Sequence, residues 1–122
     1  MTPAQLAKFP LIEAEWPPGD AHAPNWQRWR AAALRRHKSV PDFSSLVSLS
    51  FREELHAIEA AIMGRGLAIC SDVLIRSELE NGALLAVSSI KLSGYGFYAV
   101  HRDGHPKELL IKAFVAWARA NV

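Results

Sequence analysis

The sequence predicts an α/β fold in which a mostly parallel sheet is flanked by helices. Short apolar runs alternate along the chain with longer segments in which apolar residues recur at helical spacing. Loops and glycines separate these segments, and the most prominent loop is the Pro- and Gly-rich stretch 15–24. The expected order is strand, helix, strand, helix, strand, helix, strand, strand, helix, which is typical of a parallel sheet.

Length and composition limit the function classes. The chain has 122 residues, enough for one domain at most, and 50% of them are apolar while 21% are charged. The net charge is only +2, which is weak for a nucleic-acid-binding protein. Several cations gather at 28–38, near the end of a predicted helix, where the helix dipole favours them. We interpret this run as a solvated helix end rather than as a phosphate-binding patch.

The cysteine usage fits a reducing compartment, and the sequence shows no targeting segment. Cys70 is the only cysteine, which excludes an intramolecular disulfide and a cysteine-based zinc site. The sequence does not open with a basic segment followed by an apolar run, so a signal peptide is not expected. No apolar run approaches the length of a membrane span. We therefore expect a cytoplasmic protein with no membrane partner.

The first third of the chain is expected to hold a helical turn and the start of a strand within 1–12, then the loop, then a helix. That helix starts near Asn25, a residue type that commonly caps helix N-termini. Trp26, Trp29 and Ala33 are three to four residues apart. Both indoles are therefore expected on one helix face.

The middle of the chain is expected to hold a partly buried strand over 44–51 that runs straight into a helix. Two faces of that helix can be distinguished by residue type. The predicted core stripe is Phe51, Leu55, Ile58 and Ile62, and a smooth second face, suited to close helix or subunit contact, is Ala57, Ala60 and Ala61.

In the second half, Gly64 is expected to end that helix and residues 67–70 to form a short buried strand. Ser71 then caps a predicted helix over 71–82. Two further strands are expected over 83–90 and 94–102, and a final helix from Pro106. One face of the final helix carries Leu110, Ala113, Phe114, Trp117 and Asn121, and Glu108 and Lys112 are spaced as a favourable ion pair.

No catalytic or cofactor-binding motif is evident. A phosphate-binding glycine loop follows a strand and opens a helix, whereas Gly64 and Gly66 follow a helix and open a strand. His101 and His105 flank a predicted turn, so they do not form a helical zinc-binding pair. The serines lack the Gly-x-Ser-x-Gly elbow of hydrolases. We expect a protein that is not an enzyme and has no metal site and no cofactor.

The exits of the predicted strands are the remaining candidates for a site. In open α/β sheets, ligands bind beyond the carboxyl ends of the strands, where helix N-termini offer free amides. Three exits qualify, at 13–16, 50–53 and 70–72. Each polar side chain there is individually well explained as a helix cap. As a set, the exits predict the edge that meets a small ligand, expected to be anionic.

One stretch resembles a known family. Segment 55–87 contains an alanine-rich helix, the pair Gly64 and Gly66, an apolar strand, and a helix that ends in Glu-Leu-x-x-Gly-x-Leu from Glu78 to Leu84. This order closely resembles the effector-binding domain of LysR-type transcriptional regulators. The helix with Trp26 and Trp29 is most similar to the branch that includes the glycine-cleavage activator. The resemblance extends over almost the whole chain.

The resemblance implies a periplasmic-binding-protein-like fold of type II, which has two lobes. Residues 1–90 would be the effector-binding second lobe, and residues 91–122 would be the strand and C-terminal helix that return to the first lobe. Regulators of this family bind DNA through an N-terminal winged helix-turn-helix. We expect that module and most of the first lobe to be absent from this chain, so DNA would be contacted only through a segment outside it.

The resemblance also implies where an effector and a second subunit would bind. The strand-to-helix turn that contributes to the effector cleft matches Ser50, Phe51, Arg52 and Glu53, and Ser71 is a weaker candidate. The helix carrying Ala57, Ala60 and Ala61 would pack across a dimer interface, so a homodimer or higher oligomer is expected. The predicted function is effector sensing for transcription control. The alternative is a dimerisation or interaction module that senses nothing.

Overall fold

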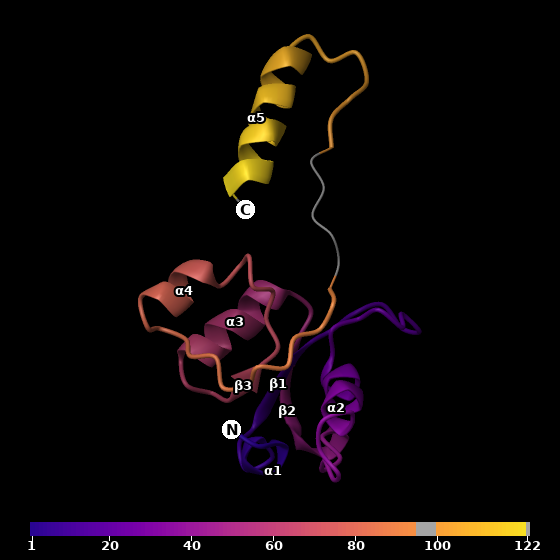
Figure 1. Cartoon of the computed structure of the whole chain (residues 1–122), viewed down its shortest axis with the longest axis vertical. Helices are drawn as coiled ribbons and strands as arrows, with labels where there is room; N and C mark the ends of the chain where they lie inside the picture. Colours follow the sequence, from indigo (N-terminus) through magenta and orange to yellow (C-terminus); the bar gives the residue numbers. More distant parts are fainter. Residues whose placement is uncertain (95–99, 122) are drawn as a thin grey trace.

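The fold comes from a computed structural model that describes residues 1–94 and 100–121 (Figure 1). Three strands form one sheet in the order β2-β1-β3, and both pairs of neighbours are parallel. The predicted α/β class with a parallel sheet is therefore confirmed. The elements are α1 (Pro3–Leu6), β1 (Leu11–Ala14), α2 (Trp26–Leu34), the 3₁₀ turn η1 (Ser44–Leu46), β2 (Val47–Phe51), α3 (Glu54–Ile62), β3 (Leu67–Ala68), α4 (Arg76–Glu80) and α5 (Glu108–Asn121).

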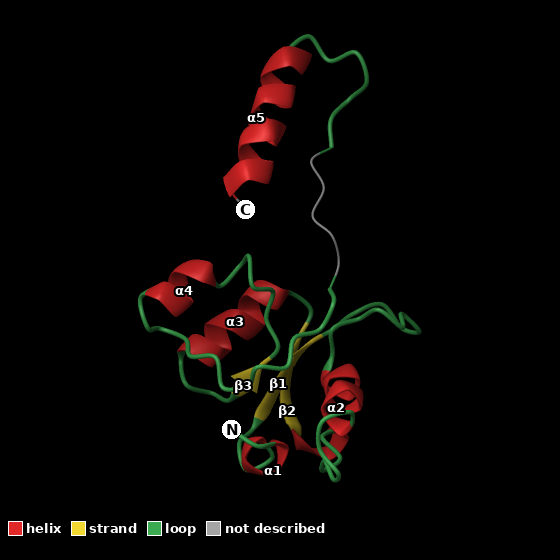
Figure 2. Ribbon diagram, viewed as in Figure 1, coloured by secondary structure: helices red, strands yellow, loops and turns green. Residues whose placement is uncertain are grey.

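The central strand β1 lies between α2 and α3 (Figure 2), and its residues join apolar clusters on both faces of the sheet. Leu11 points to the α2 side, where it belongs to the larger apolar cluster, and Ile12 points to the α3 side. This alternation follows from the two-residue period of a strand. The sheet therefore lies between α2 and α3, as expected for strands that are connected by crossover helices.

The α2 side holds the larger part of the core. The indole of Trp26 donates a hydrogen bond from Nε1 to the Ile12 carbonyl oxygen at 2.8 Å, which ties α2 to β1. Asn25 caps the helix by accepting a hydrogen bond from the Arg28 amide at 2.8 Å, as predicted. Trp26, Trp29 and Phe43 meet as an aromatic group with ring centroids 5.5 to 5.8 Å apart. The shared face of the two indoles is therefore confirmed.

The predicted core stripe of α3 is partly wrong. Leu55 and Ile62 are 59% and 42% exposed, whereas Ala57 and Ala60 are buried against Ile12 and Ala14 of β1. Small alanine side chains let the helix approach the strand closely, so the helix is rotated with its alanines inward and its larger residues outward. Of the residues in the predicted stripe, Ile58 is the buried one.

The pair Gly64 and Gly66 makes a helix stop and a strand start, as predicted. Gly64 follows α3 with a φ of +75°, the left-handed conformation that commonly ends helices. At Gly66 a Cβ would lie 2.4 Å from the Pro10 carbonyl oxygen, and the next amide, that of Leu67, donates to the same oxygen at 2.9 Å. Glycine is therefore required where the turn approaches the start of β1.

The chain after β3 departs from the predicted pattern. The strand is confined to Leu67–Ala68, two residues shorter than expected, and the helix expected over 71–82 is reduced to α4. The Ser71 side chain does not cap a helix, because its hydroxyl donates to the Glu54 carboxylate at 3.0 Å. The residues between Ser71 and α4 instead form turns.

The strand expected over 83–90 is absent from the described part of the chain. Val87, Ile90 and Leu92 pack against the apolar cluster on the α2 side, so this segment contributes side chains to the core without joining the sheet. The next expected strand, 94–102, includes residues 95–99, which lie outside the described residues. Gly94 and residues 100–102 are not in a strand.

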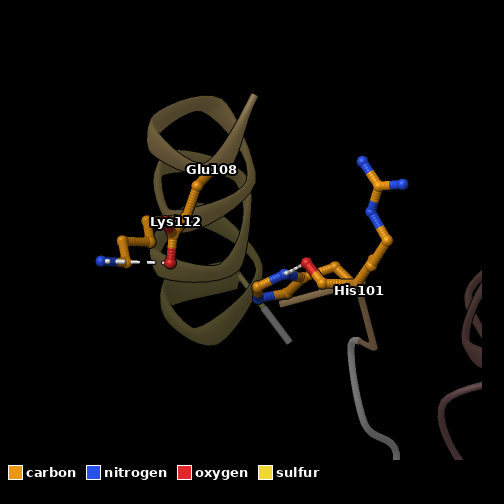
Figure 3. Close-up of polar contacts among 4 residues, drawn as sticks. His101, Glu108 and Lys112 are labelled. Carbon is orange, nitrogen blue, oxygen red and sulfur yellow. Dashed lines mark hydrogen bonds and ion pairs between the residues drawn. The ribbon is translucent and has the colours of Figure 1, made fainter. Parts of the chain in front are cut away.

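The final helix α5 stands apart from the sheet and its covering helices (Figure 1). It begins two residues after Pro106, and the predicted Glu108–Lys112 ion pair is present at 3.7 Å (Figure 3). Figure 3 also shows His101, whose Nδ1 lies 3.1 Å from the Arg102 carbonyl oxygen. The expected apolar face is largely exposed, with Phe114 at 59% and Trp117 at 60%.

Candidate functional site

The carboxyl ends of the three strands meet at one edge of the sheet, because all three run in parallel. The Glu15 amide, just beyond β1, donates to the carbonyl oxygen of Phe51 at the end of β2 over 2.7 Å. The hydroxyl of Ser50 donates to the Glu15 carboxylate at 3.4 Å. The exits of β1 and β2, which the sequence assigned separately, are therefore in direct contact.

An open pocket of about 520 Å³ lies beside the exit of β1. The loop that follows the strand forms one wall, and the N-terminal end of α2 forms another. Two structural hydrogen bonds fix this end of the helix: the Glu13 carboxylate accepts one from the Trp26 amide at 3.2 Å, and Asn25 caps the first turn. The polar side chains around the pocket are Glu13, Glu15, Trp16, Asp20, Asn25 and Gln27.

The exit of β3 is tied to the start of α3. The Glu54 carboxylate accepts two hydrogen bonds from Ser71, one from its amide at 2.6 Å and one from its hydroxyl at 3.0 Å. Such charge-assisted bonds are short and strong. Ser71 is therefore a positioning residue in this conformation, since its hydroxyl is committed to Glu54.

Cys70 directly precedes Ser71, and its thiol is in an environment that makes it unreactive. Burial, together with the negative charge of Glu54, raises the pKa of the Cys70 thiol to about 11. Both causes disfavour the thiolate, which is the reactive form. Cys70 therefore behaves as a small apolar residue.

The residues of the predicted turn differ in their surroundings. Ser50, Arg52 and Glu53 are exposed, while Phe51 is half-buried with its ring 6.5 Å from the imidazole of His56. Glu53 precedes the first helical residue of α3 and makes no side-chain cap bond. Three of the four predicted residues thus present polar side chains to solvent at the strand exits.

Some residues of this edge escaped the sequence analysis. Glu54 was not among the predicted site residues, although its carboxylate links the start of α3, which follows β2, to the exit of β3. Its position in the first turn of a helix that follows a strand was the available signal. Asp20 and Asn25 were assigned to a loop and a cap, and nothing in the local sequence indicates that both border one pocket.

The alanine face of α3 contacts the sheet of its own chain. Ala57 and Ala60 are 1% and 7% exposed, and Ala61 packs against the same cluster. These side chains are therefore covered by β1 in this conformation, because close approach to the strand is what the small residues permit. A subunit contact through α3 stays a prediction. Its exposed large apolar residues are Leu55 and Ile62, and Met63 directly after the helix is exposed too.

Within residues 1–94 and 100–121, no three side chains of the metal-binding types gather closely enough to hold a metal ion. None of the helices in that part of the chain combines the length and apolar character needed to cross a bilayer.

Comparison with known proteins identifies the family. The model of the LysR substrate binding domain matches residues 1–122, the whole sequence. The chain belongs to this family. The chain is also 29% identical over 120 residues to the glycine cleavage system transcriptional activator of Escherichia coli, and 29% identical over 119 residues to its homologue in Haemophilus influenzae. No solved structure matches significantly.

The alignments include nearly all of this chain but only part of each activator. The alignment to the Escherichia coli activator includes 98% of this LysR-family chain and 36% of that protein. A shorter match, 36% identical over 74 residues, is to an HTH-type transcriptional regulator of Sinorhizobium fredii. The chain thus spans about a third of the length of the curated activators it matches, and the resemblance inferred from its motifs is confirmed.

Proposed function

We propose that this chain is an effector-binding segment of a LysR-type transcriptional regulator, and that a small molecule binds at the exits of β1 and β2. The hydrogen bond from Ser50 to Glu15 carries this proposal, because it joins the exit of β2 to Glu15, which lines the pocket beside the exit of β1. Ligand sites in open α/β sheets form at such edges. Ser50, Phe51, Arg52 and Glu53 are the proposed contact residues, and Ser71 supports them through Glu54.

The charges at this edge refine the expected ligand. Arg52 offers a guanidinium to an anionic group, and this is the basis for an anionic effector. Glu15 follows β1 and Glu53 follows β2, and both carboxylates are exposed. They would repel a ligand that carries only negative charge. We therefore propose a small polar effector with an anionic group near Arg52 and a donor or positive group near Glu15.

In the intact regulator, we propose that residues 1–90 form the effector-binding lobe and that residues 91–122 pack with segments of the other lobe. The exposed apolar face of α5 supports this division, since such a face is normally covered. DNA would be bound by a helix-turn-helix outside this chain. Action on DNA implies a cytoplasmic protein.

A thermal-shift screen tests the proposal. A panel of small carboxylic acids, amines and zwitterions would be screened against the chain and against Ser50→Ala and Arg52→Gln variants. A ligand that raises the melting temperature should lose most of that effect in both variants. Ser48→Ala is the matched control, because Ser48 is an exposed serine of the same strand. If Ser48→Ala weakens binding as much as Ser50→Ala does, the strand exit is not the site.

The second candidate function is a dimerisation module that senses nothing. The exposed apolar residues Leu55 and Ile62 of α3, with Met63 directly after it, favour it, because a second subunit could cover them. A tight dimer by solution mass measurement, combined with no thermal shift from any compound in the panel, would favour this function over effector binding.

A further inference from the structure

A second depression lies at the opposite end of the sheet from the strand exits. Helix α2 begins beside the exit of β1, where Trp26 bonds to Ile12 and Glu13, and it runs back toward the edge where the strands start. The depression adjoins the far end of α2 and the segment 86–91, and its volume is about 650 Å³. This volume is in the range of small-molecule sites.

The polar side chains around this depression are basic or hydroxylic. Arg36 and His37 follow the end of α2, while Lys91, Ser88 and Ser89 come from the segment that packs against the core. None of the residues described around the depression is acidic. Within the described chain, Arg36, His37 and Lys91 form no ion pair. Two segments that are far apart in the sequence thus bring basic side chains without acidic partners to the same depression.

Other arginines of α2 serve the fold instead. Arg28 donates to the carbonyl oxygens of His22 and Ser93, and Arg30 donates to those of Val40 and Pro41. The basic run at 28–38 was interpreted from the sequence as a solvated helix end, but it divides into structural cations and, at Arg36 and His37, cations that line the depression. The helix dipole explains a preference for cations at the end of α2, but it does not explain why Lys91 lies there too.

We propose that this depression, which we call the basic pocket, binds the phosphate group of a small phosphomonoester. The Arg36 guanidinium matches two phosphate oxygens, and Lys91 adds a second positive charge. The hydroxyls of Ser88 and Ser89 supply further donors. The pocket is distinct from the strand-exit edge proposed for the effector. Its concave shape favours a small ligand over duplex DNA, whose backbone is contacted along extended basic surfaces.

The test is direct binding of inorganic phosphate and phenyl phosphate to the whole chain by calorimetry at low salt. The double variant R36Q/K91Q should raise the Kd of both compounds by about tenfold or more, the effect of losing two charge-assisted contacts. The matched control R35Q/K38Q removes two exposed cations from the same helix end that do not line the pocket. It should change the Kd by less than about threefold, a loss of long-range attraction alone.

Three results would overturn the proposal. One is an equal loss in both double variants, which would mean diffuse attraction to the basic run. Another is an absence of phosphate and phenyl phosphate binding by the unaltered chain. The third is tight binding of a random DNA duplex, lost in R36Q/K91Q, without binding of either small compound. Because all four positions are exposed, unchanged melting temperatures should show that the variants remain folded.

Discussion

Trp26 connects α2 to the sheet through a buried hydrogen bond, in addition to its apolar contacts. Its Nε1 donates to the Ile12 carbonyl oxygen at 2.8 Å, and its ring packs edge-on against Trp29 and Phe43. Trp26→Phe keeps an aromatic ring but leaves this buried carbonyl without its donor. We expect a loss of about 1–3 kcal/mol in the free energy of unfolding, measured by urea denaturation. Trp117→Phe, on the exposed face of α5, should cost less than about 0.5 kcal/mol.

Gly66 and Gly64 make a matched pair for testing the turn before β3. At Gly66 an added Cβ would meet the Pro10 carbonyl oxygen, whereas at Gly64 nothing lies within 4 Å. Both have positive φ, so each alanine variant is strained, and Gly66→Ala carries a steric clash as well. We expect Gly64→Ala to cost about 1 kcal/mol and Gly66→Ala about 2–3 kcal/mol or more. Equal costs in urea denaturation would mean that the close approach to Pro10 is relaxed in solution.

The thiol of Cys70 should titrate well above the usual range. Its pKa is raised to about 11, first by burial and second by the Glu54 charge. Between the unfolded-state pKa and about pH 11, the unfolded chain loses this proton while the folded chain keeps it, so stability should fall as pH rises. Alkylation by iodoacetamide across pH measures the pKa. Glu54→Gln should lower it only in part, because burial remains; an unchanged pKa would exclude a role for Glu54.

Helix α5 forms without burying its apolar face, although Arg76 of α4 donates a hydrogen bond to its Asn121 carbonyl oxygen at 3.4 Å. Its apolar face is largely exposed, and a helix of 14 residues without packing is marginal in water. We expect Phe114→Ser to change the urea unfolding free energy by less than about 0.5 kcal/mol, while Phe43→Ser costs several kcal/mol because Phe43 is buried. A similar loss for both variants would show that α5 packs on the core.

Several elements could be predicted from the sequence because their evidence is local. The cap at Asn25, the shared face of Trp26 and Trp29, and the turn at Gly64 depend on neighbours within a few residues, and all three are present. The segment 83–90 could not be assigned in this way. Its apolar residues suit a strand or a loop that packs on the core, and the choice depends on distant partners.

The prediction of which face of α3 is buried was partly wrong for a related reason. Leu55 and Ile62 are more hydrophobic than Ala57 and Ala60, so periodicity alone directs them inward. Close packing on β1 instead favours the alanines, and this depends on a strand more than forty residues earlier in the chain. At the site, the order of the strands predicted which exits share an edge. The bond between Glu54 and Ser71 depends on the path of two loops and could not be predicted.

The two proposed sites place side chains of different charge at opposite ends of the sheet. The strand-exit edge carries the carboxylates Glu13, Glu15, Asp20, Glu53 and Glu54 together with Arg52, while the opposite end carries the basic pocket. The small net charge of +2 conceals this separation. Two ligands of different charge could therefore bind the same chain at separate places, and their effects should be independent.

Chemical-shift mapping tests the proposed effector site most directly. The ¹⁵N-labelled chain would be titrated with the compound that gives the largest thermal shift, and amide shifts would be followed by NMR. The proposal predicts the largest changes at the two strand exits, in residues 50–53 and 15–16, with little change in 36–38 or 88–91. Changes confined to other regions, or saturation without any shift at 50–53, would contradict an effector site at the exits of β1 and β2.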